Sequence, residues 1–154
     1  MTYLFEIRSK LNVPSELFWQ QAIQMSSVNA ELWPIIRMTF PRTMEKLNPS
    51  NHDMGKCLFR SIILLFGFLP IDLYDVTFIE FVQGEHFQEK SPTLTQKWWK
   101  HRRQIQNIET GCYVIDRVEI LPKIKLLGNI YIWFVKMLFT QRHHNLRKRY
   151  GVIA

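Results

Sequence analysis

Apolar residues recur in the alternating or continuous runs typical of β-strands through most of the first 121 positions. The first such segment covers residues 2–13. Six more follow after a helical segment, at residues 35–40, 56–66, 71–82, 84–90, 96–107 and 111–121. Turn sequences separate several of them, among them GFLP at residues 67–70 and IETG at residues 108–111. This part of the chain is therefore predicted to form a sheet.

Two segments follow a helical period instead. Pro14 fits the first turn of a helix and Glu16 complements its dipole, so a short helical segment is expected after the first strand. Its helical pattern fades before Pro34, which marks a break. Residues 124–150 are predicted to form one long helix, with Gly151 where a C-terminal cap belongs.

This order of elements predicts an α+β fold, in which a curved antiparallel sheet of about seven strands wraps around a long C-terminal helix. A sheet of that shape can leave a cavity between its concave face and the helix. The chain has 154 residues, of which 47% are hydrophobic, which is enough for one substantial core. We therefore expect a single domain over residues 1–154.

The long helix is expected to present one apolar stripe to the sheet. On a wheel of about 100° per residue, the stripe contains Gly128, Ile132, Val135, Phe139, Leu146 and Tyr150. Arg142 and His143 flank this stripe, whereas His144 and Lys148 point away from it. We therefore expect Arg142 and His143 to face the sheet, where helix length brings Arg142 close to Asp116 or to a bound anion.

The first half of this helix is apolar nearly all round. Ile130, Trp133 and Met137 lie away from the stripe, and Lys136 is the only charged residue between Ile130 and Phe139. A helix of this kind is either buried on two sides or exposes an apolar patch. The pattern suggests a homodimer or contact with a membrane surface, and the basic end of the helix suits anionic lipid.

The formal net charge of +7 is concentrated in two basic groups, at residues 97–103 and 142–149. Such groups attract phosphates or anionic lipids, and they are also common on ordinary solvated faces. In the sequence KWWKHRR, aromatic and cationic residues alternate as they do in proteins that stack nucleic-acid bases. Period-two alternation leaves only Trp98, Lys100 and Arg102 for an outer patch, so nucleic acid is the less favoured partner.

Several kinds of site have no signature in the sequence. Cys57 and Cys112 are too far apart for a disulfide framework or a zinc motif, and we expect reduced core thiols in a cytoplasmic protein. The N-terminus does not resemble a signal peptide, and no apolar run reaches the ~20 residues of a membrane-spanning helix. No metal-ligand spacing or glycine-rich phosphate loop is present, so neither a metal nor a cofactor is predicted. No spacing supports a Ser-His-Asp triad.

The last hairpin of the predicted sheet carries the strongest candidate chemistry. Alternation places His101 and Arg103 on the inward face of its first strand and Asp116 on the inward face of its second strand. If Asn107 pairs with Cys112, Arg103 lies directly across from Asp116, at a spacing where opposite charges attract. Inward charges are costly unless they are paired.

Three interpretations of these residues remain open. Arg103 and Asp116 can neutralise each other and serve only the sheet. They can instead form, with His101, the polar end of a cavity that orients a ligand. In the third interpretation His101 acts in acid–base catalysis, with Asp116 or Glu89. Glu89 enters because it shares a face with Phe87 in the preceding short strand, which makes it another inward carboxyl group.

A set of short motifs, in order along nearly the whole chain, resembles the START-like, helix-grip superfamily, and more narrowly its bacterial ligand-binding SRPBCC and polyketide cyclase-like members. These motifs are PSELFW, LLFGFLP, FQEKS, WWKHRRQI, GCYVIDRVEILPK and LFTQRHHNLRKRYG. The resemblance implies the helix-grip fold and a single START-like ligand-binding domain. It also implies a cavity, because members of the superfamily bind lipids, sterols, quinones and aromatic polyketides, and only some are catalysts.

The favoured function is therefore binding of a hydrophobic or amphipathic small molecule, such as a lipid, quinone or polyketide-like compound, between the sheet and the C-terminal helix. The residues expected to contact it are Glu89, Trp99, His101, Arg103, Asp116, Phe139, Arg142 and His143. One alternative is a cyclase or dehydratase that uses the inward His and Asp. The other is an interaction module at an anionic membrane or nucleic acid.

Overall fold

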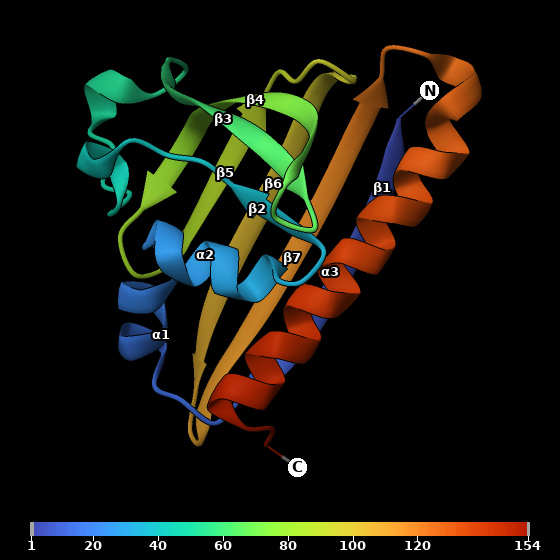
Figure 1. Ribbon diagram of the computed structural model, residues 1–154. Coiled ribbons are helices and arrows are strands. Elements are labelled where there is room, and N and C mark those ends of the chain that lie inside the picture. The colour runs from blue at the N-terminus through green and yellow to red at the C-terminus, as the bar shows by residue number, and fades with distance from the viewer. Residues whose placement is uncertain (1, 154) are drawn as a thin grey trace.

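A computed structural model describes residues 2–153 of the chain. Seven strands form one antiparallel sheet in the order β1-β7-β6-β5-β4-β3-β2 (Figure 1). The strands are β1 (Tyr3–Leu11), β2 (Ile36–Met38), β3 (Cys57–Leu65), β4 (Leu69–Val82), β5 (His86–Ser91), β6 (Gln96–Ile108) and β7 (Gly111–Pro122). The helices are α1 (Ser15–Ala22), α2 (Met25–Leu32) and α3 (Gly128–Tyr150), with short 3₁₀ turns at Arg42–Met44, Asn51–Asp53 and Lys125–Leu127.

The long helix α3 runs beside β1 and β7, while α1 and α2 lie near its C-terminal half (Figure 1). The sheet curls around these helices, so the space between its concave face and the helices is where apolar side chains gather. This is the helix-grip arrangement, and the predicted α+β fold class, with seven strands and a long C-terminal helix, is confirmed.

The helical regions differ in detail from the sequence prediction. The segment after β1 forms two helices, because Gln24 adopts an extended conformation and makes a bridge to Lys46 instead of continuing α1. The C-terminal helix begins at Gly128, after a 3₁₀ turn, rather than at residue 124. A Cβ atom at Gly128 would lie 2.3 Å from the Tyr3 hydroxyl oxygen, so the helix can approach β1 this closely only with glycine there.

Register places the charged residues of the last hairpin as the alternation predicts. Asn107 pairs with Cys112, and Arg103 lies directly across from Asp116. His101, Arg103 and Asp116 are all buried. Because these polar side chains are buried, each must find its hydrogen-bond partners inside the protein.

One expectation about the thiols is wrong. Cys112 is buried as predicted, but Cys57 is exposed at the start of β3, so it is not a core residue. Both thiols are free. None of the helices in the described part of the chain is long and apolar enough to cross a membrane.

Candidate functional site

A cavity of about 360 Å³ lies between the concave face of the sheet and the helices. Its wall is mainly apolar, with Met25 and Leu32 from α2, Phe78 from β4, and Phe134 and Phe139 from α3. The volume is within the range of about 300–1,000 Å³ that is usual for small-molecule sites. Such a wall would remove the apolar surface of a ligand from water.

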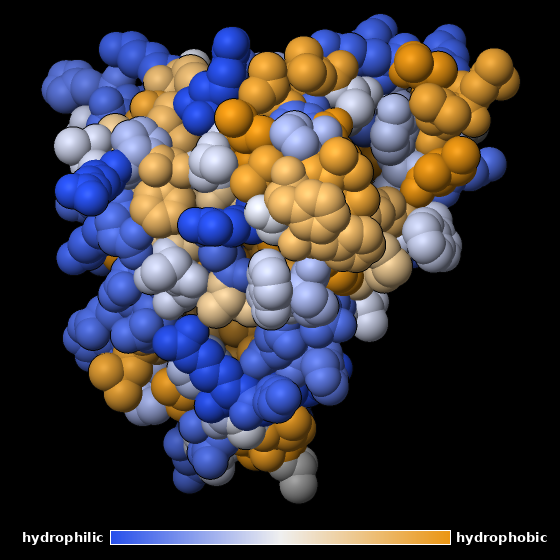
Figure 2. All heavy atoms as spheres, viewed as in Figure 1, coloured by the Kyte–Doolittle hydropathy of each residue, from blue (hydrophilic) through white to orange (hydrophobic). Residues whose placement is uncertain are grey.

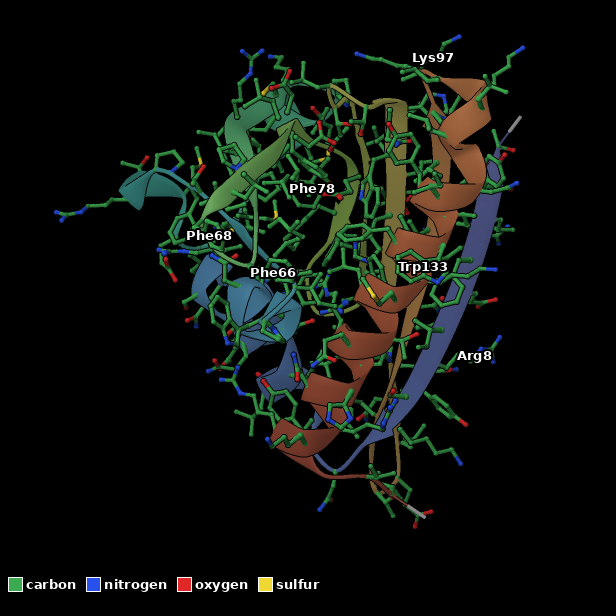
Figure 3. The ribbon with its side chains drawn as sticks, turned by 45° about the vertical axis from the view of Figure 1, so that its right-hand side comes forward. Arg8, Phe66, Phe68, Phe78, Lys97 and Trp133 are labelled. Atoms are coloured by element: carbon green, nitrogen blue, oxygen red, sulfur yellow. The ribbon has the colours of Figure 1, made fainter. Side chains whose placement is uncertain are left out.

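The cavity opens beside a group of exposed apolar side chains. Ile130 and Trp133 of α3 line it and yet are 61% and 63% exposed, so they mark its mouth. Across from them, the turn between β3 and β4 exposes Phe66 and Phe68 (Figure 3). Figure 2 shows apolar side chains gathered over this turn and over the first half of α3. We call this surface the mouth face and define it by Phe66, Phe68, Ile130 and Trp133.

Glu89 of β5 is the most unusual polar residue of the cavity wall. Its Oε1 accepts hydrogen bonds from the Tyr74 hydroxyl and, at 2.9 Å, from Trp99 Nε1. Burial raises the pKa of Glu89 to about 8, against the opposing effects of the Trp99 hydrogen bond and the positive charge of Arg142. Glu89 is therefore a neutral carboxylic acid at pH 7.

His101 of β6 lies directly across from Glu89 and also lines the cavity. Its Nε2 is 2.8 Å from Asp116 Oδ1. Burial lowers the pKa of His101, although the hydrogen bond and charge of Asp116 favour the protonated ring. Asp116 can only accept a hydrogen bond as a carboxylate, so the neutral ring carries its proton on Nε2 and leaves Nδ1 as an acceptor.

Asp116 of β7 is the centre of a buried ionic network. Its two oxygens accept from Arg103 Nε and Nη2, each at 2.8 Å, as well as from His101 and from His143 Nε2 at 2.7 Å. Burial alone would raise the pKa of Asp116, but the charge of Arg103 and the hydrogen bonds from Arg103, His101 and His143 hold it well below its usual range. With four donors around it, Asp116 is an acceptor and not a proton donor.

Glu31 of α2 is the second carboxylate of the network. Its Oε1 accepts from Arg103 Nη2 at 2.8 Å and from Arg142 Nη2 at 3.0 Å. Burial opposes ionisation of Glu31, but the charges of Arg103 and Arg142 lower its pKa below the ordinary value. The two carboxylates and two guanidinium groups of this network balance each other in charge.

Ser9, His143 and Asp116 form a hydrogen-bonded row, which sequence spacing did not suggest. The Ser9 hydroxyl oxygen is 2.7 Å from His143 Nδ1, and it also accepts from Arg147 Nη1 at 3.0 Å. The row resembles a nucleophilic triad in composition only. Ser9 and His143 are buried and do not line the cavity, so this hydroxyl has no access to a substrate. We interpret the row as the attachment of α3 to β1 and β7.

Aromatic rings connect the polar groups to the apolar wall. The ring of Phe139 lies 6.0 Å from that of Trp99 and 5.1 Å from that of His101, measured between centroids. The Arg142 guanidinium lies 5.0 Å from the centre of the same Phe139 ring. These contacts hold Trp99, His101 and Arg142 against one edge of the cavity.

The structure divides the eight predicted site residues into two groups. Glu89, Trp99, His101, Phe139 and Arg142 line the cavity. The other three, Arg103, Asp116 and His143, lie behind it in the ionic network and do not reach the cavity wall.

The predicted partner of Arg142 also differs. Arg142 and His143 both face inward, as expected, but Arg142 binds Glu31, while His143 is the α3 residue that binds Asp116. Glu31 was missed because it lies where the helical pattern of the sequence fades. Tyr74 was also missed, since a tyrosine in a strand is usually read as a packing residue.

A family model described as "Domain of unknown function (DUF8410)" matches residues 9–150. That span contains every residue of the cavity wall and of the ionic network. The chain belongs to the DUF8410 family. A search of curated protein sequences gave no match for this DUF8410 protein.

Solved structures with the same fold share little sequence with the DUF8410 protein. The Zhui aromatase/cyclase from Streptomyces sp. R1128 has a TM-score of 0.69 at 5% identity, covering 97% of this chain and 93% of that one. A START superfamily protein from Mycobacterium smegmatis has a TM-score of 0.59 at 4% identity, covering 96% and 97%. Ara h 8.0201 has a TM-score of 0.56 at 9% identity, covering 96% and 99%. The DUF8410 protein therefore has the START-like fold.

Proposed function

We propose that the protein binds a hydrophobic or amphipathic small molecule, such as a lipid, quinone or polyketide-like compound, in the cavity between the sheet and α3. The observation that carries this proposal is the cavity itself, about 360 Å³ of mainly apolar wall with a small number of polar side chains, among them Glu89, His101 and Arg142. An apolar wall supplies affinity through burial of ligand surface, and a few polar groups supply orientation. The shared START-like fold supports the same function.

The direct test is native mass spectrometry of the protein purified from its own host. We expect a population with a bound lipophilic mass that is lost on denaturation. Val76 of β4 lines the cavity and is buried, so Val76→Phe fills part of the space and should lower the bound fraction several-fold. Leu4→Phe, at an exposed position of β1, is the matched control. A wild-type protein that carries no lipophile and is stabilised by none would count against the proposal.

A second candidate function is acid–base catalysis of the cyclase or dehydratase kind. The favouring observation is that Glu89 and His101, which face each other across two strands, have pKa values shifted in opposite directions. A neutral acid next to a neutral base is the arrangement that proton transfer requires at neutral pH. In a β-hydroxyketone, His101 Nδ1 would take the proton from the carbon next to the carbonyl. Glu89 would donate a hydrogen bond to the enolate oxygen that forms, and the proton on His101 would pass to the departing hydroxyl, releasing water and a conjugated enone.

This candidate is tested with 4-hydroxy-4-(2-naphthyl)butan-2-one, whose dehydration gives an enone with a strong ultraviolet absorption. Turnover by the wild-type protein that is lost in His101→Ala would support catalysis. Tight binding of the compound without more enone than forms in buffer would show that the protein binds it but does not catalyse its dehydration. Asp116 is not proposed as the acid, because four hydrogen bonds already occupy its oxygens.

The mouth face supports an additional role at an anionic membrane surface. The residues from Lys123 to Lys136, beside the mouth, include three Lys and no Asp or Glu, so this segment attracts negative charge. Sedimentation with phosphatidylserine-containing vesicles should pull down the wild-type protein but not Trp133→Glu. Leu4→Glu, which adds the same charge at an exposed site on β1, should still sediment. Equal sedimentation of the two variants, or none by the wild type, would contradict this role. Light scattering would show whether the same face forms a dimer instead.

A further inference from the structure

Four polar side-chain atoms in the described part of the chain are buried without a partner and closed off from solvent: Trp19 Nε1, Ser61 Oγ, Gln96 Oε1 and Arg103 Nη1. Glu89 Oε2 differs from them. Within residues 2–153 it has no hydrogen-bond partner either, but it keeps accessible surface, and Glu89 lines the cavity while only 7% exposed. The open surface of this oxygen is therefore that of the cavity.

The position of the proton on Glu89 follows from its partners. The indole N–H of Trp99 can only donate, and the Tyr74 hydroxyl donates to the same oxygen, so Oε1 accepts two hydrogen bonds. The acid proton is left to Oε2, the oxygen that faces the cavity. Glu89 therefore offers a ligand an O–H donor.

Two further open atoms belong to the same edge of the cavity. His101 Nδ1 has no partner within the described residues and, as a bare ring nitrogen, can only accept. Arg142 uses Nε and Nη2 on Glu31, which leaves Nη1 without a protein partner in that part of the chain. The edge thus combines an O–H donor, a nitrogen acceptor and an N–H donor.

The carboxylate and guanidinium charges around this edge are equal in number, and His143 lies behind Asp116, outside the cavity wall. Glu31 offsets Arg142, Asp116 offsets Arg103, and Glu89 and His101 are neutral. No positively charged group at this edge is left without a carboxylate partner, so none is free to pair with an anionic ligand. An anionic ligand would therefore have to be desolvated without a free counter-charge, which is costly.

We propose that the cavity selects a neutral lipophile that carries a carbonyl and a nearby hydroxyl group, with the carbonyl accepting from Glu89 and Arg142 and the hydroxyl donating to His101. This inference rests on the proposed ligand-binding function and specifies the polar part of the ligand. It separates β-hydroxyketones and related neutral compounds from fatty-acid-like carboxylates, although both groups have apolar bodies that suit the wall.

The test compares four compounds that share a naphthalene body, by isothermal titration calorimetry at pH 7. They are 2-butylnaphthalene, 4-(2-naphthyl)butan-2-one, 4-hydroxy-4-(2-naphthyl)butan-2-one and 3-hydroxy-3-(2-naphthyl)propanoate. Each added hydrogen bond should tighten binding by about 3- to 10-fold, so the hydroxyketone should bind most tightly. The carboxylate, which replaces only the methyl ketone, should bind at least about tenfold more weakly than the hydroxyketone.

Raising the pH provides a second readout for Glu89. Affinity for the hydroxyketone should fall above pH 8, by up to about tenfold per pH unit, as the carboxyl loses its proton and its donor. The groups facing Glu89 that could also contribute are Tyr74 of β4, His101 of β6 and Arg142 of α3. Glu89→Gln keeps an acceptor and a donor but cannot ionise, so its affinity should stay constant over this range.

The outcomes distinguish a failure of the proposed selection for a neutral ligand from a failure of the proposed ligand-binding function. If all four compounds bind but the carboxylate binds as tightly as the hydroxyketone, the selection for a neutral ligand is overturned while the cavity function stands. An equal affinity of the hydrocarbon and the hydroxyketone would likewise overturn it. Absence of binding by every compound, the hydrocarbon included, would overturn the cavity function as well.

Discussion

Glu89 and His101 lie directly opposite each other on β5 and β6, and burial shifts their pKa values in opposite directions. Both side chains reach the cavity. The result is a neutral acid beside a neutral base in a mainly apolar space. This pair is the chemical centre of the site, and the ionic network behind it holds His101 in place through Asp116.

Glu89 should make the stability of the protein depend on pH in a direction opposite to that of a salt-bridged acid. Its folded pKa, about 8, is above its ordinary value of 4.5, so the folded state keeps a proton that the unfolded chain has lost. Stability should therefore fall as pH rises from about 4.5 to 8, by about 1.4 kcal/mol per pH unit from this group.

Glu89→Gln removes that dependence. The difference in the free energy of unfolding between the variant and the wild type, measured in urea at several pH values, should increase in favour of the variant up to about pH 8 and then level off. A difference that is constant with pH would show that Glu89 is ionised in the folded protein.

The pairing of Arg103 with Asp116 can be tested by a double-mutant cycle. Asp116→Asn or Arg103→Met should each cost about 3–5 kcal/mol, because each leaves a buried charge without its partner. The double variant should recover only part of this loss, since Glu31, His101 and His143 each lose a hydrogen-bond partner as well. The urea-unfolding free energies of the three variants give the interaction energy, and strictly additive losses would show that the pair does not interact.

Two basic residues of α3, six positions apart, should behave very differently. Arg142 is 6% exposed and bonds to buried Glu31, so Arg142→Ala should destabilise the protein by a few kcal/mol and weaken ligand binding. Lys148 is exposed, so Lys148→Ala should change neither by more than about 0.5 kcal/mol. Thermal melting with and without 4-(2-naphthyl)butan-2-one compares the two. Equal effects would indicate that Arg142 acts as an ordinary surface cation.

Periodicity in the sequence was sufficient to predict most of the fold. Alternation and turn sequences predicted all seven strands, and the parity of the last hairpin predicted that Arg103 would face Asp116. The wheel of the long helix predicted that Arg142 and His143 would be buried and Lys148 exposed. These patterns succeed because they depend on local geometry, which one strand or helix determines by itself.

Contacts between distant elements were harder to predict. The Arg142 side chain binds Glu31, 111 positions away, because α2 folds over the end of α3, and neither element alone indicates this. The Tyr74 contact to Glu89 likewise depends on how β4 curves past β5. Cys57 is exposed at the start of β3, outside the stretch Ile63–Leu65 where β2 pairs with β3.

The indole N–H signals in a two-dimensional ¹H–¹⁵N NMR titration with 2-butylnaphthalene show whether a lipophile enters the space between the sheet and α3. Trp99 and Trp98 are adjacent on β6 but occupy opposite faces: the Trp99 N–H bonds to Glu89 at the cavity, whereas the Trp98 ring lies under Lys90 and Lys100 on the outer face. The Trp99 signal should move progressively and saturate while the Trp98 signal stays fixed. An unchanged Trp99 signal in the presence of bound compound, or shifts confined to exposed indoles, would show that the compound binds elsewhere and would contradict the account.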